Sequence, residues 1–386
     1  MEPANRIVNL PPYPFASLGK RIAELKAQGM DVIRLDIGSP DLPPPSWIID
    51  ALCSSARDPH HHGYGGYYGI PALRQAMATY YRRRFDVDLD PASEVVPLIG
   101  SKEGIVNIAL AYLDPGDLAL VPDPGYAPYT MGALLAAGQV ETFPLLAGRN
   151  YLPDLSAIPS EVADRARLIW LNYPNNPTGA TATSEFFAEA VDFAREHGLL
   201  ICHDAPYCDL TYDGYVAPSI LQVEGAREVA LEFNSLSKVY NMAGWRVGMA
   251  VGNRQAAEAL ARVKTNVDSG IFRAIQDAAI EALTGDQSWL PGRNAVYQER
   301  RDVILAGLAA VGIHASKPQA SLYVWTPVPA GYTSEAFTTK LLEEQGVSIT
   351  PGTVFGPHGE GYARISLGAD TGRIREAMGR LAVFEF

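Results

Sequence analysis

The feature that most constrains the fold is the alternation of short apolar segments with helical segments in the middle of the chain. Residues 167–172, 199–204 and 228–234 form apolar or β-rich runs, and helical stretches such as 184–197 lie between them. This pattern is typical of a parallel sheet flanked by helices, an α/β fold. Each run ends in polar residues, and open α/β sheets bind ligands beyond the carboxyl ends of their strands. We therefore expect the functional site at those ends.

The length of 386 residues corresponds to two or three domains of about 150 residues, or to one large domain with a smaller partner. The proline-rich segment 38–45 predicts an extended arm, which marks a boundary. From about residue 295 the pattern changes to a helix over 297–310, a strand over 321–325, a helix over 335–345, a strand over 363–367 and a last helix from Thr371. We expect an N-terminal arm (1–45), a large domain (46–290) and a smaller α+β domain (291–386) that the arm completes.

Composition and charge exclude several classes of protein. The 31 basic and 43 acidic residues leave a net charge of −12, which disfavours nucleic acid as a partner. The three cysteines (Cys53, Cys202 and Cys208) are an odd number without metal-type spacing, so we expect a reducing compartment and no disulfide framework. The chain begins without a signal-peptide pattern and contains no run of 18 apolar residues. These features predict a cytoplasmic protein without a membrane partner.

A lysine follows the third apolar run directly. Lys238 ends the sequence Ser235-Leu-Ser-Lys238, and Gly244, Arg246 and Gly248 come shortly after it. A lysine that can lose its proton forms Schiff bases with carbonyl groups, and pyridoxal phosphate is the commonest such carbonyl. The alternative is a solvated surface lysine. The flanking serines and glycines, with few acidic neighbours, favour the chemical role.

Polar residues also follow the other two runs. Asp204 closes the apolar run 199–204. Without other evidence, an aspartate in this place is interpreted as a structural cap. If the ligand is pyridoxal phosphate, the same aspartate would keep the ring nitrogen protonated. Tyr207 is a candidate partner of the ring hydroxyl, or else a packed core residue. Asn176, in the rigid turn from Asn172 to Gly179, is a candidate donor to the same oxygen, although the turn alone indicates only a loop.

A glycine-rich segment, Gly100–Gly104, opens a helix that we expect to run to Tyr112. Amides at a helix start attract anions such as phosphate, although this segment alone favours an ordinary helix start with Ser101 as the N-cap. The segment 63–69 lacks the spacing and the preceding strand of a dinucleotide fingerprint. The histidines at 60–62 have no ligand partner at a suitable spacing, so they predict a solvated turn and no metal site.

Seven motifs occur in one order along the chain: G-x-P-D from Gly38, Tyr64 five residues before Gly69, N-N-P-T-G at 175–179, D-x-x-Y at 204–207, S-x-S-K at 235–238, G-x-R-x-G at 244–248 and A-R-I-S at 363–366. Together they resemble the class I/II aminotransferases, which are fold-type I pyridoxal-phosphate enzymes. The resemblance spans nearly the whole chain. Residues 100–105 and 233–246 are most similar to the LL-diaminopimelate aminotransferase group.

The resemblance implies a role for each matching residue toward pyridoxal 5′-phosphate. Lys238 would bind the cofactor and move a proton from the substrate α-carbon, and Asp204 would pair with the ring nitrogen. The remaining implied contacts are Tyr207 and Asn176 on the ring oxygen, Tyr126 on the ring face, and Ser235, Arg246 and the amides of Ser101 and Lys102 on the phosphate. Tyr64 matches a tyrosine that reaches the phosphate of the neighbouring subunit, which implies a homodimer.

Arg364 matches the arginine that binds the substrate α-carboxylate. A planar guanidinium binds a carboxylate through two parallel bonds and so fixes the α-hydrogen relative to the ring. Without the other motifs, a surface ion pair would be the simpler interpretation of Arg364. The main chain at Gly38 is expected to assist with the same carboxylate, and Asn176 also borders the substrate.

The function implied is transfer of an amino group from an L-amino acid to a 2-oxo acid by a ping-pong mechanism, with LL-diaminopimelate and 2-oxoglutarate as a candidate pair. The residues after Tyr64 lack the acidic residue of better-defined members of that group, so aspartate, alanine and aromatic aminotransferases stay open, as does a lyase on the same fold. A serine-acylating hydrolase is a remote alternative, because Ser235 to Lys238 satisfies S-x-x-K but K-T-G is absent. We expect loops at 13–18, 64–70 and 265–273 to recognise the substrate side chain.

Overall fold

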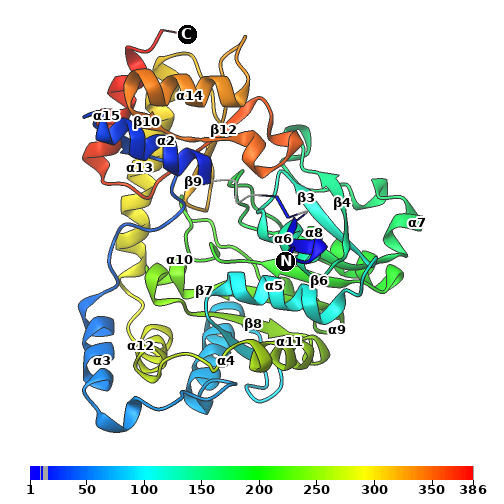
Figure 1. Cartoon of the computed structure of the whole chain (residues 1–386). Helices are drawn as coiled ribbons and strands as arrows, with labels where there is room; N and C mark the ends of the chain where they lie inside the picture. Colours follow the sequence, from blue (N-terminus) through cyan, green and yellow to red (C-terminus); the bar gives the residue numbers. More distant parts are fainter. Residues whose placement is uncertain (9, 12–15, 386) are drawn as a thin grey trace.

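The computed structural model describes residues 1–8, 10–11 and 16–385. A seven-stranded sheet forms its centre, in the order β2-β8-β7-β6-β5-β3-β4 (Figure 1). Its strands are β2 (Val95–Leu98), β3 (Leu118–Asp123), β4 (Gln139–Pro144), β5 (Ala166–Asn172), β6 (Leu200–Asp204), β7 (Ala230–Ser235) and β8 (Gly248–Gly252). Only β8 runs antiparallel to its neighbours, so the predicted α/β fold with a mostly parallel sheet is confirmed.

Both faces of this sheet are buried, because alternate residues of each strand point to opposite sides. Leu168 and Trp170 of β5 belong to a core with α5 (Ser101–Tyr112), α6 (Pro128–Leu135) and α11 (Arg254–Val267). Ile169 and Leu171 belong to the opposite core, with α3 (Ser46–Ala56), α4 (Pro71–Phe85), α8 (Ser184–His197) and α12 (Arg273–Thr284). This double burial explains why the strands read as continuous apolar runs.

The C-terminal part of the chain forms a second, smaller unit. The long helix α13 (Leu290–Ala310) leads into it from the large sheet (Figure 1). Its antiparallel sheet has the order β11 (Thr350–Pro351), β12 (Tyr362–Ser366) and β9 (Tyr323–Pro327), and α14 (Ser334–Gln345) and α15 (Thr371–Ala382) pack with it. The sequence predicts these elements to within a few residues, except for the start of α13.

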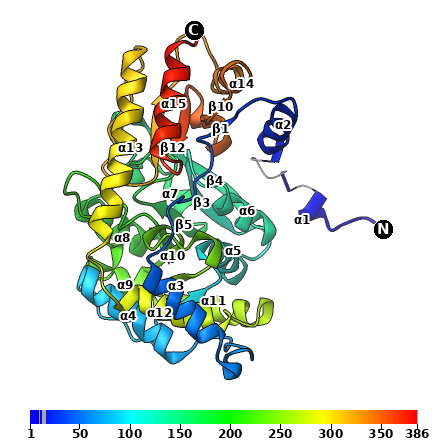
Figure 2. The same cartoon turned by 90° about the vertical axis from the view of Figure 1, so that its left-hand side faces the viewer.

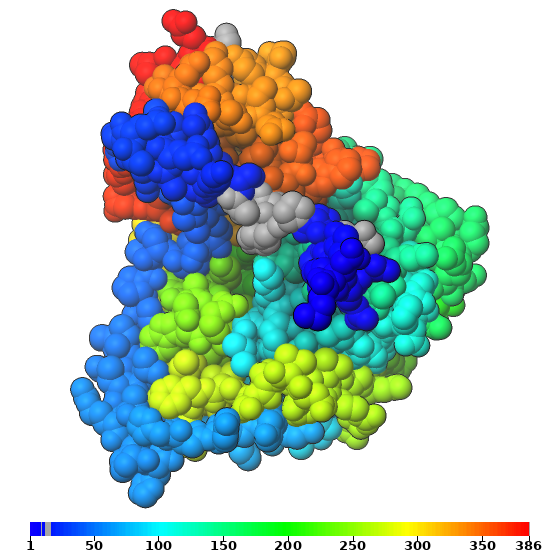
Figure 3. Space-filling view, in the orientation of Figure 1, coloured from blue at the N-terminus to red at the C-terminus, as the bar shows by residue number. Residues whose placement is uncertain are grey.

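The N-terminal arm joins this smaller unit. Strand β1 (Ile33–Arg34) pairs in parallel with β10 (Val347–Ser348), and α2 (Ala16–Ala27) packs on α14 through a small core that includes Ile22 and Leu342. Figure 2 shows α2 beside the orange helix α14, and Figure 3 shows the blue arm against the orange C-terminal segment. The arm therefore helps to complete the smaller unit, while the domain boundaries at 45/46 and 290/291 stay a prediction.

Two predicted boundaries were wrong, and both have a local cause. The strand predicted from residue 228 begins only at Ala230, because Gly225 takes a positive φ of 77° and starts the short helix α9 (Ala226–Val229). The helix predicted from 297 begins at Leu290, since Pro291 fits the first turn of a helix, where its missing N–H is not needed.

Short elements connect the larger ones: α1 (Asn5–Val8), α7 (Ser160–Ala163), α10 (Leu236–Val239), and the 3₁₀ turns η1 (Pro59–His61), η2 (Ala147–Arg149), η3 (Leu155–Ala157), η4 (Ile220–Gln222), η5 (Ala243–Trp245), η6 (Gly352–Phe355) and η7 (Pro357–Gly359). Within the described residues, no helix combines the length and apolarity needed to cross a membrane.

Candidate active site

A cavity of about 360 Å³ lies where β5, β6 and β7 end and where the N-terminal arm, β9 and β12 approach the large sheet. Every predicted site residue except Tyr64 lines it: Gly38, Ser101, Lys102, Tyr126, Asn176, Asp204, Tyr207, Ser235, Lys238, Arg246 and Arg364. Tyr64 is 88% exposed and lies outside the cavity. The sequence motifs therefore converge on one place, as the rule for strand ends predicts.

Lys238 stands in the short helix α10, directly after β7. Its Nζ donates a 2.6 Å hydrogen bond to the backbone oxygen of Gly38. Burial lowers the pKa of Lys238 to about 8, and the positive charges of Arg364 and Arg246 contribute to the same shift. A lysine with this pKa is readily deprotonated near neutral pH, as nucleophilic chemistry requires.

Asp204 ends β6 and is buried at the floor of the cavity. Its Oδ2 accepts a 2.8 Å hydrogen bond from the hydroxyl of Tyr129, whose ring stacks on Trp170 at 4.6 Å. Its Oδ1 has no hydrogen-bond partner among the described residues. Burial raises the pKa of Asp204 to about 6, although the bond from Tyr129 opposes this shift. An unpartnered carboxylate oxygen in such a place can accept a hydrogen bond from a ligand or pair with a cationic group of a ligand.

Asn172 joins the ends of two strands. Asn172 lies opposite Asp204 in the register of β5 and β6. Its Nδ2 donates a 2.6 Å hydrogen bond to the backbone oxygen of Asp204, and its Oδ1 accepts a 2.8 Å hydrogen bond from the amide of Asn176. These bonds hold the turn that carries Asn176 against the strand end that carries Asp204. The side chain of Asn176 in turn accepts a 2.8 Å bond from Arg364.

Arg364 lies on β12 and is only 3% exposed, so the surface ion pair considered from the sequence is excluded. Its Nη2 donates to the backbone oxygen of Asp36 at 2.9 Å. Its guanidinium lies over the rings of Tyr323 and Phe355, at 4.2 and 4.7 Å from the ring centres. The aromatic rings and hydrogen bonds fix the orientation of this cation in the cavity wall.

The start of α5 forms an anion-binding cradle with Arg246. The N-cap residue is Gly100, with a φ of 73°, so Ser101 is the first helical residue and not the cap predicted from the sequence. Because glycine has no side chain, no side-chain hydrogen bond caps the first amides of the helix. A Cβ at Gly100 would lie 2.2 Å from the Arg246 guanidinium, and the positive φ strains any other residue, so glycine is favoured at this position. Burial and the charge of Arg246 lower the pKa of Lys102. Helix amides and nearby cations suit a phosphate group.

Tyr207 is a packed core residue, as one interpretation of the sequence predicts, while its contact with the ring hydroxyl stays a prediction. It is buried in the core of the smaller unit and also lines the cavity. Its hydroxyl shares a 2.8 Å hydrogen bond with the hydroxyl of Tyr323. The two tyrosines therefore link the loop after β6 to β9.

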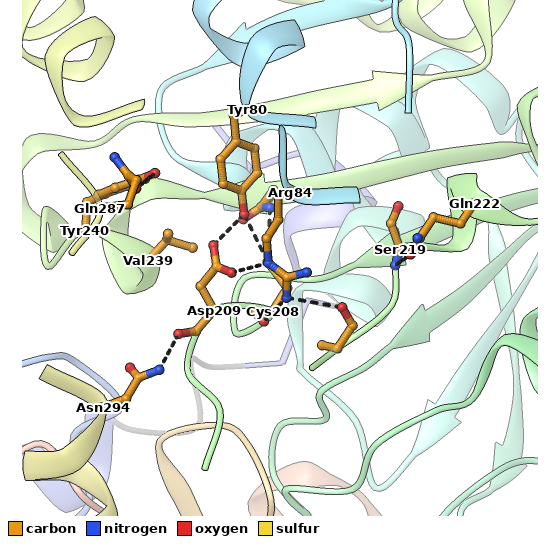
Figure 4. Close-up of polar contacts among 12 residues, drawn as sticks. Tyr80, Arg84, Cys208, Asp209, Ser219, Gln222, Val239, Tyr240, Gln287 and Asn294 are labelled. Carbon is orange, nitrogen blue, oxygen red and sulfur yellow. Dashed lines mark hydrogen bonds and ion pairs between the residues drawn. The ribbon is translucent and has the colours of Figure 1, made fainter. Parts of the chain in front are cut away.

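A polar cluster outside the cavity fixes the same loop (Figure 4). Tyr80 and Arg84 of α4 converge on the carboxylate of Asp209, each at 2.6 Å. Arg293 of α13 donates to the backbone oxygens of Asp209 (2.7 Å) and Lys238 (3.2 Å). Arg293 therefore ties the segment that carries Lys238 to the loop after β6.

Several cavity residues were not predicted: Arg34, Asp36, Ile37, Asn172, Pro206, Ser237, Ala243 and Tyr323. Asn172 and Ser237 lie inside motifs that the sequence already singles out, so their position at a strand end was a usable signal. Arg34, Asp36 and Tyr323 carry no such signal. Of the loops expected to recognise the side chain, residues 13–15 lie outside the described part of the chain, and no described residue of 16–18, 64–70 or 265–273 lines the cavity.

The polar groups that line the cavity fit pyridoxal phosphate. An orphan carboxylate oxygen, an anion cradle at a helix start and a lysine with a lowered pKa occupy one cavity at the carboxyl edge of a doubly wound sheet. These features define a pyridoxal-phosphate-dependent enzyme with an α/β fold.

Comparison with known proteins identifies the family. Residues 30–381 match the family described as aminotransferase class I and II. The chain is 55% identical to the LL-diaminopimelate aminotransferase of Moorella thermoacetica over 381 residues, covering 99% of this chain and 98% of the relative. It is 54% identical to the enzyme of that name from Desulforudis audaxviator, covering 98% and 96%. This chain belongs to the class I and II aminotransferases.

Solved structures agree with this assignment. Substrate-bound BacF from Bacillus subtilis superposes with a TM-score of 0.95 at 36% identity, covering 99% of this chain and 97% of that one. A Thermus thermophilus aspartate aminotransferase variant superposes with a TM-score of 0.93 at 29% identity, covering 99% of both chains. The protein is a pyridoxal-phosphate-dependent aminotransferase, acting on amino acids and 2-oxo acids.

Proposed function

We propose that this aminotransferase takes LL-diaminopimelate as amino donor and passes the amino group to a 2-oxo dicarboxylic acid such as 2-oxoglutarate. The observation that carries the proposal is the identity of 48–55% to relatives named LL-diaminopimelate aminotransferase, over at least 98% of this chain. The segments 100–105 and 233–246, which resemble that group, both contribute to the cavity.

Bound pyridoxal phosphate supplies an electron-withdrawing ring that stabilises negative charge on the substrate α-carbon. Asp204 would hold its ring nitrogen, since the orphan Oδ1 offers an acceptor there. The other holding residues in this proposal are Tyr207 and Asn176 at the ring oxygen, Tyr126 at the ring face, and Ser235, Arg246 and the amides of Ser101 and Lys102 at the phosphate.

Two residues act on every amino-acid substrate in this proposal. Arg364 binds the α-carboxylate and, with the main chain at Gly38, orients the α-hydrogen. Lys238 takes that proton on Nζ, which its pKa of about 8 permits for an appreciable fraction of molecules near neutral pH. Neither residue reads the side chain, so substrate choice depends on other groups.

We further propose that the protein forms a homodimer and acts in the cytoplasm. Gln276 donates to the backbone of Gly65 at 3.0 Å and of Ile271 at 2.7 Å, and so holds two loops side by side. Large apolar side chains of these loops and of the end of α11 are exposed: Tyr64, Tyr67, Tyr68, Val267 and Phe272. A second copy covering this face would bury them and would bring Tyr64 to the site of its partner.

A half-reaction screen tests the substrate. The purified holoenzyme is mixed separately with LL-diaminopimelate, glutamate, aspartate, alanine and an aromatic amino acid, and the absorbance of the bound cofactor is followed. LL-diaminopimelate and glutamate should react at least about tenfold faster than the others, a ratio equivalent to 1.4 kcal/mol. Fastest reaction with aspartate, alanine or the aromatic acid would reject the proposed donor. Release of ammonia or carbon dioxide without an acceptor would indicate lyase activity instead.

A further inference from the structure

An ion pair in the cavity wall has no role in the mechanism described above. Nε and Nη2 of Arg34 donate to the two carboxylate oxygens of Asp36, each at 2.6 Å. Both residues line the cavity, with Asp36 3% exposed and the side chain of Arg34 32% exposed. Residues two apart in an extended segment point to the same side, which is why the two side chains meet.

Arg34 retains donors after this pairing. A guanidinium carries five N–H groups, and Asp36 occupies only the edge formed by Nε and Nη2. Nη1 donates to no group among the described residues. Asp36 therefore fixes the plane of the guanidinium, and the remaining N–H groups can bind a second carboxylate.

Asp36 also sets the distance from Arg34 to Arg364. Its backbone oxygen accepts from Arg364 at 2.9 Å, while its side chain holds Arg34. One residue thus contacts both guanidinium groups, which places them on the order of 10 Å apart from covalent and hydrogen-bond lengths. A short molecule with a carboxylate at each end can bridge two cations at such a spacing.

The other cations of the cavity are already assigned. Arg246 lies at the start of α5, and its charge helps to lower the pKa of Lys102, so these two cations are neighbours at the anion cradle. Lys238 stands at the reaction centre. Arg34 is the remaining cation in the cavity lining of the described chain, and Asp36 contacts both Arg34 and Arg364.

We propose that Arg34 binds the second carboxylate of dicarboxylic substrates while Arg364 binds the first. This inference deepens the proposed function and rests on it, since LL-diaminopimelate and 2-oxoglutarate both carry a carboxylate at the far end. The two guanidinium groups, held by one aspartate, then select dicarboxylic over monocarboxylic amino acids and 2-oxo acids.

Equilibrium binding of two simple acids tests this role. Calorimetry on the holoenzyme compares glutarate with pentanoate, which has the same number of carbons and one carboxylate fewer. The wild-type enzyme should bind glutarate at least about tenfold more tightly, because a charged, planar hydrogen-bonding pair is added. Arg34→Met should remove this preference by weakening glutarate at least about tenfold, with pentanoate changed less than about twofold, and Arg34→Lys should be intermediate.

A control variant makes the test specific. Arg21→Met removes a comparable two-point contact, to Glu343 outside the cavity, and should keep the glutarate preference. The inference is overturned if wild type lacks the preference, if R34M retains it or weakens both acids equally, or if R21M abolishes it. Inactivity of the wild type with LL-diaminopimelate would contradict the proposed donor alone, because neither acid in the binding test is that substrate.

Discussion

The Nζ atom of Lys238 lies 2.6 Å from the backbone oxygen of Gly38, a residue 200 positions earlier in the chain. The N-terminal arm therefore reaches the reaction centre with its main chain. Gly38 has no room for a side chain there, because a Cβ would lie 2.2 Å from the hydroxyl oxygen of Tyr323. Since Tyr323 also bonds Tyr207, the arm, the loop after β6 and β9 meet at one point.

Gly38→Ala should therefore displace either the arm or Tyr323. Overpacking of this kind costs about 1–3 kcal/mol in the free energy of unfolding, which urea denaturation measures. Gly19→Ala is the matched control: nothing lies within 4 Å of its Cβ position in α2, so we expect unchanged or slightly higher stability. Adding Tyr323→Phe should restore part of the loss. A G38A protein as stable as wild type would contradict the close contact.

Lys238→Ala should abolish transamination, because the variant has no amine to attach the cofactor or to move the α-proton. We expect a loss of at least about 10³-fold in kcat, within the range for a positioned proton-transfer group. Circular dichroism should show an intact fold, and some cofactor should still bind. Lys317→Ala, which removes an exposed lysine paired with Asp213, serves as the control. Near-normal turnover by K238A would refute the assignment.

The sequence predicts those parts of the site that depend on local pattern. Asp204, Ser235 and Asn176 follow apolar runs, and the carboxyl ends of neighbouring parallel strands necessarily meet at one edge. The start of α5 was recognisable from Gly100. Continuous apolar runs and helix starts are properties of short segments, so the sequence shows them without knowledge of the tertiary structure.

The remaining parts of the site depend on contacts between distant segments. Tyr129 meets Asp204 across 75 positions, and Arg364 meets Asp36 across 328. No local pattern marks Tyr129 or Asp36, because each acquires its partner only when a helix or the arm packs against the sheet. The same reason applies to Tyr323, whose partner lies 116 positions away.

The stability of the cofactor-free protein should depend on pH through Asp204. Its pKa is raised to about 6 in the folded state from 3.8, so the protonated form favours folding. This contribution is complete below about pH 4 and is lost as the pH rises through 6; a shift of this size corresponds to about 3 kcal/mol. Urea denaturation at pH 4.5 and 7 should show Asp204→Asn gaining stability relative to wild type as the pH rises. A difference that does not change with pH would contradict the raised pKa.

Arg364→Leu should weaken every amino-acid substrate, because all of them present an α-carboxylate. Loss of a charged, two-point hydrogen bond costs about 3 kcal/mol, or roughly 10²-fold in kcat/KM. Steady-state kinetics with glutamate, alanine and an aromatic acid measures this effect, and Arg364→Lys should retain part of the activity. If only one class of substrate suffered, Arg364 would be reading the side chain and not the α-carboxylate.

Tyr64 provides a test of the homodimer, because its exposed position is explained if it acts in the site of a second copy. Tyr64→Ala should lower activity at least about tenfold by removing a hydrogen bond to a charged group. Tyr64→Ala and Lys238→Ala proteins are then unfolded together, refolded and assayed. A mixed dimer has one site with both native residues only if Tyr64 serves the partner subunit. Half of randomly paired dimers are mixed, and each mixed dimer then has one intact site of two. The mixture should therefore regain up to about a quarter of wild-type activity. Activity no higher than the mean of the two separate variants would place Tyr64 outside the partner site.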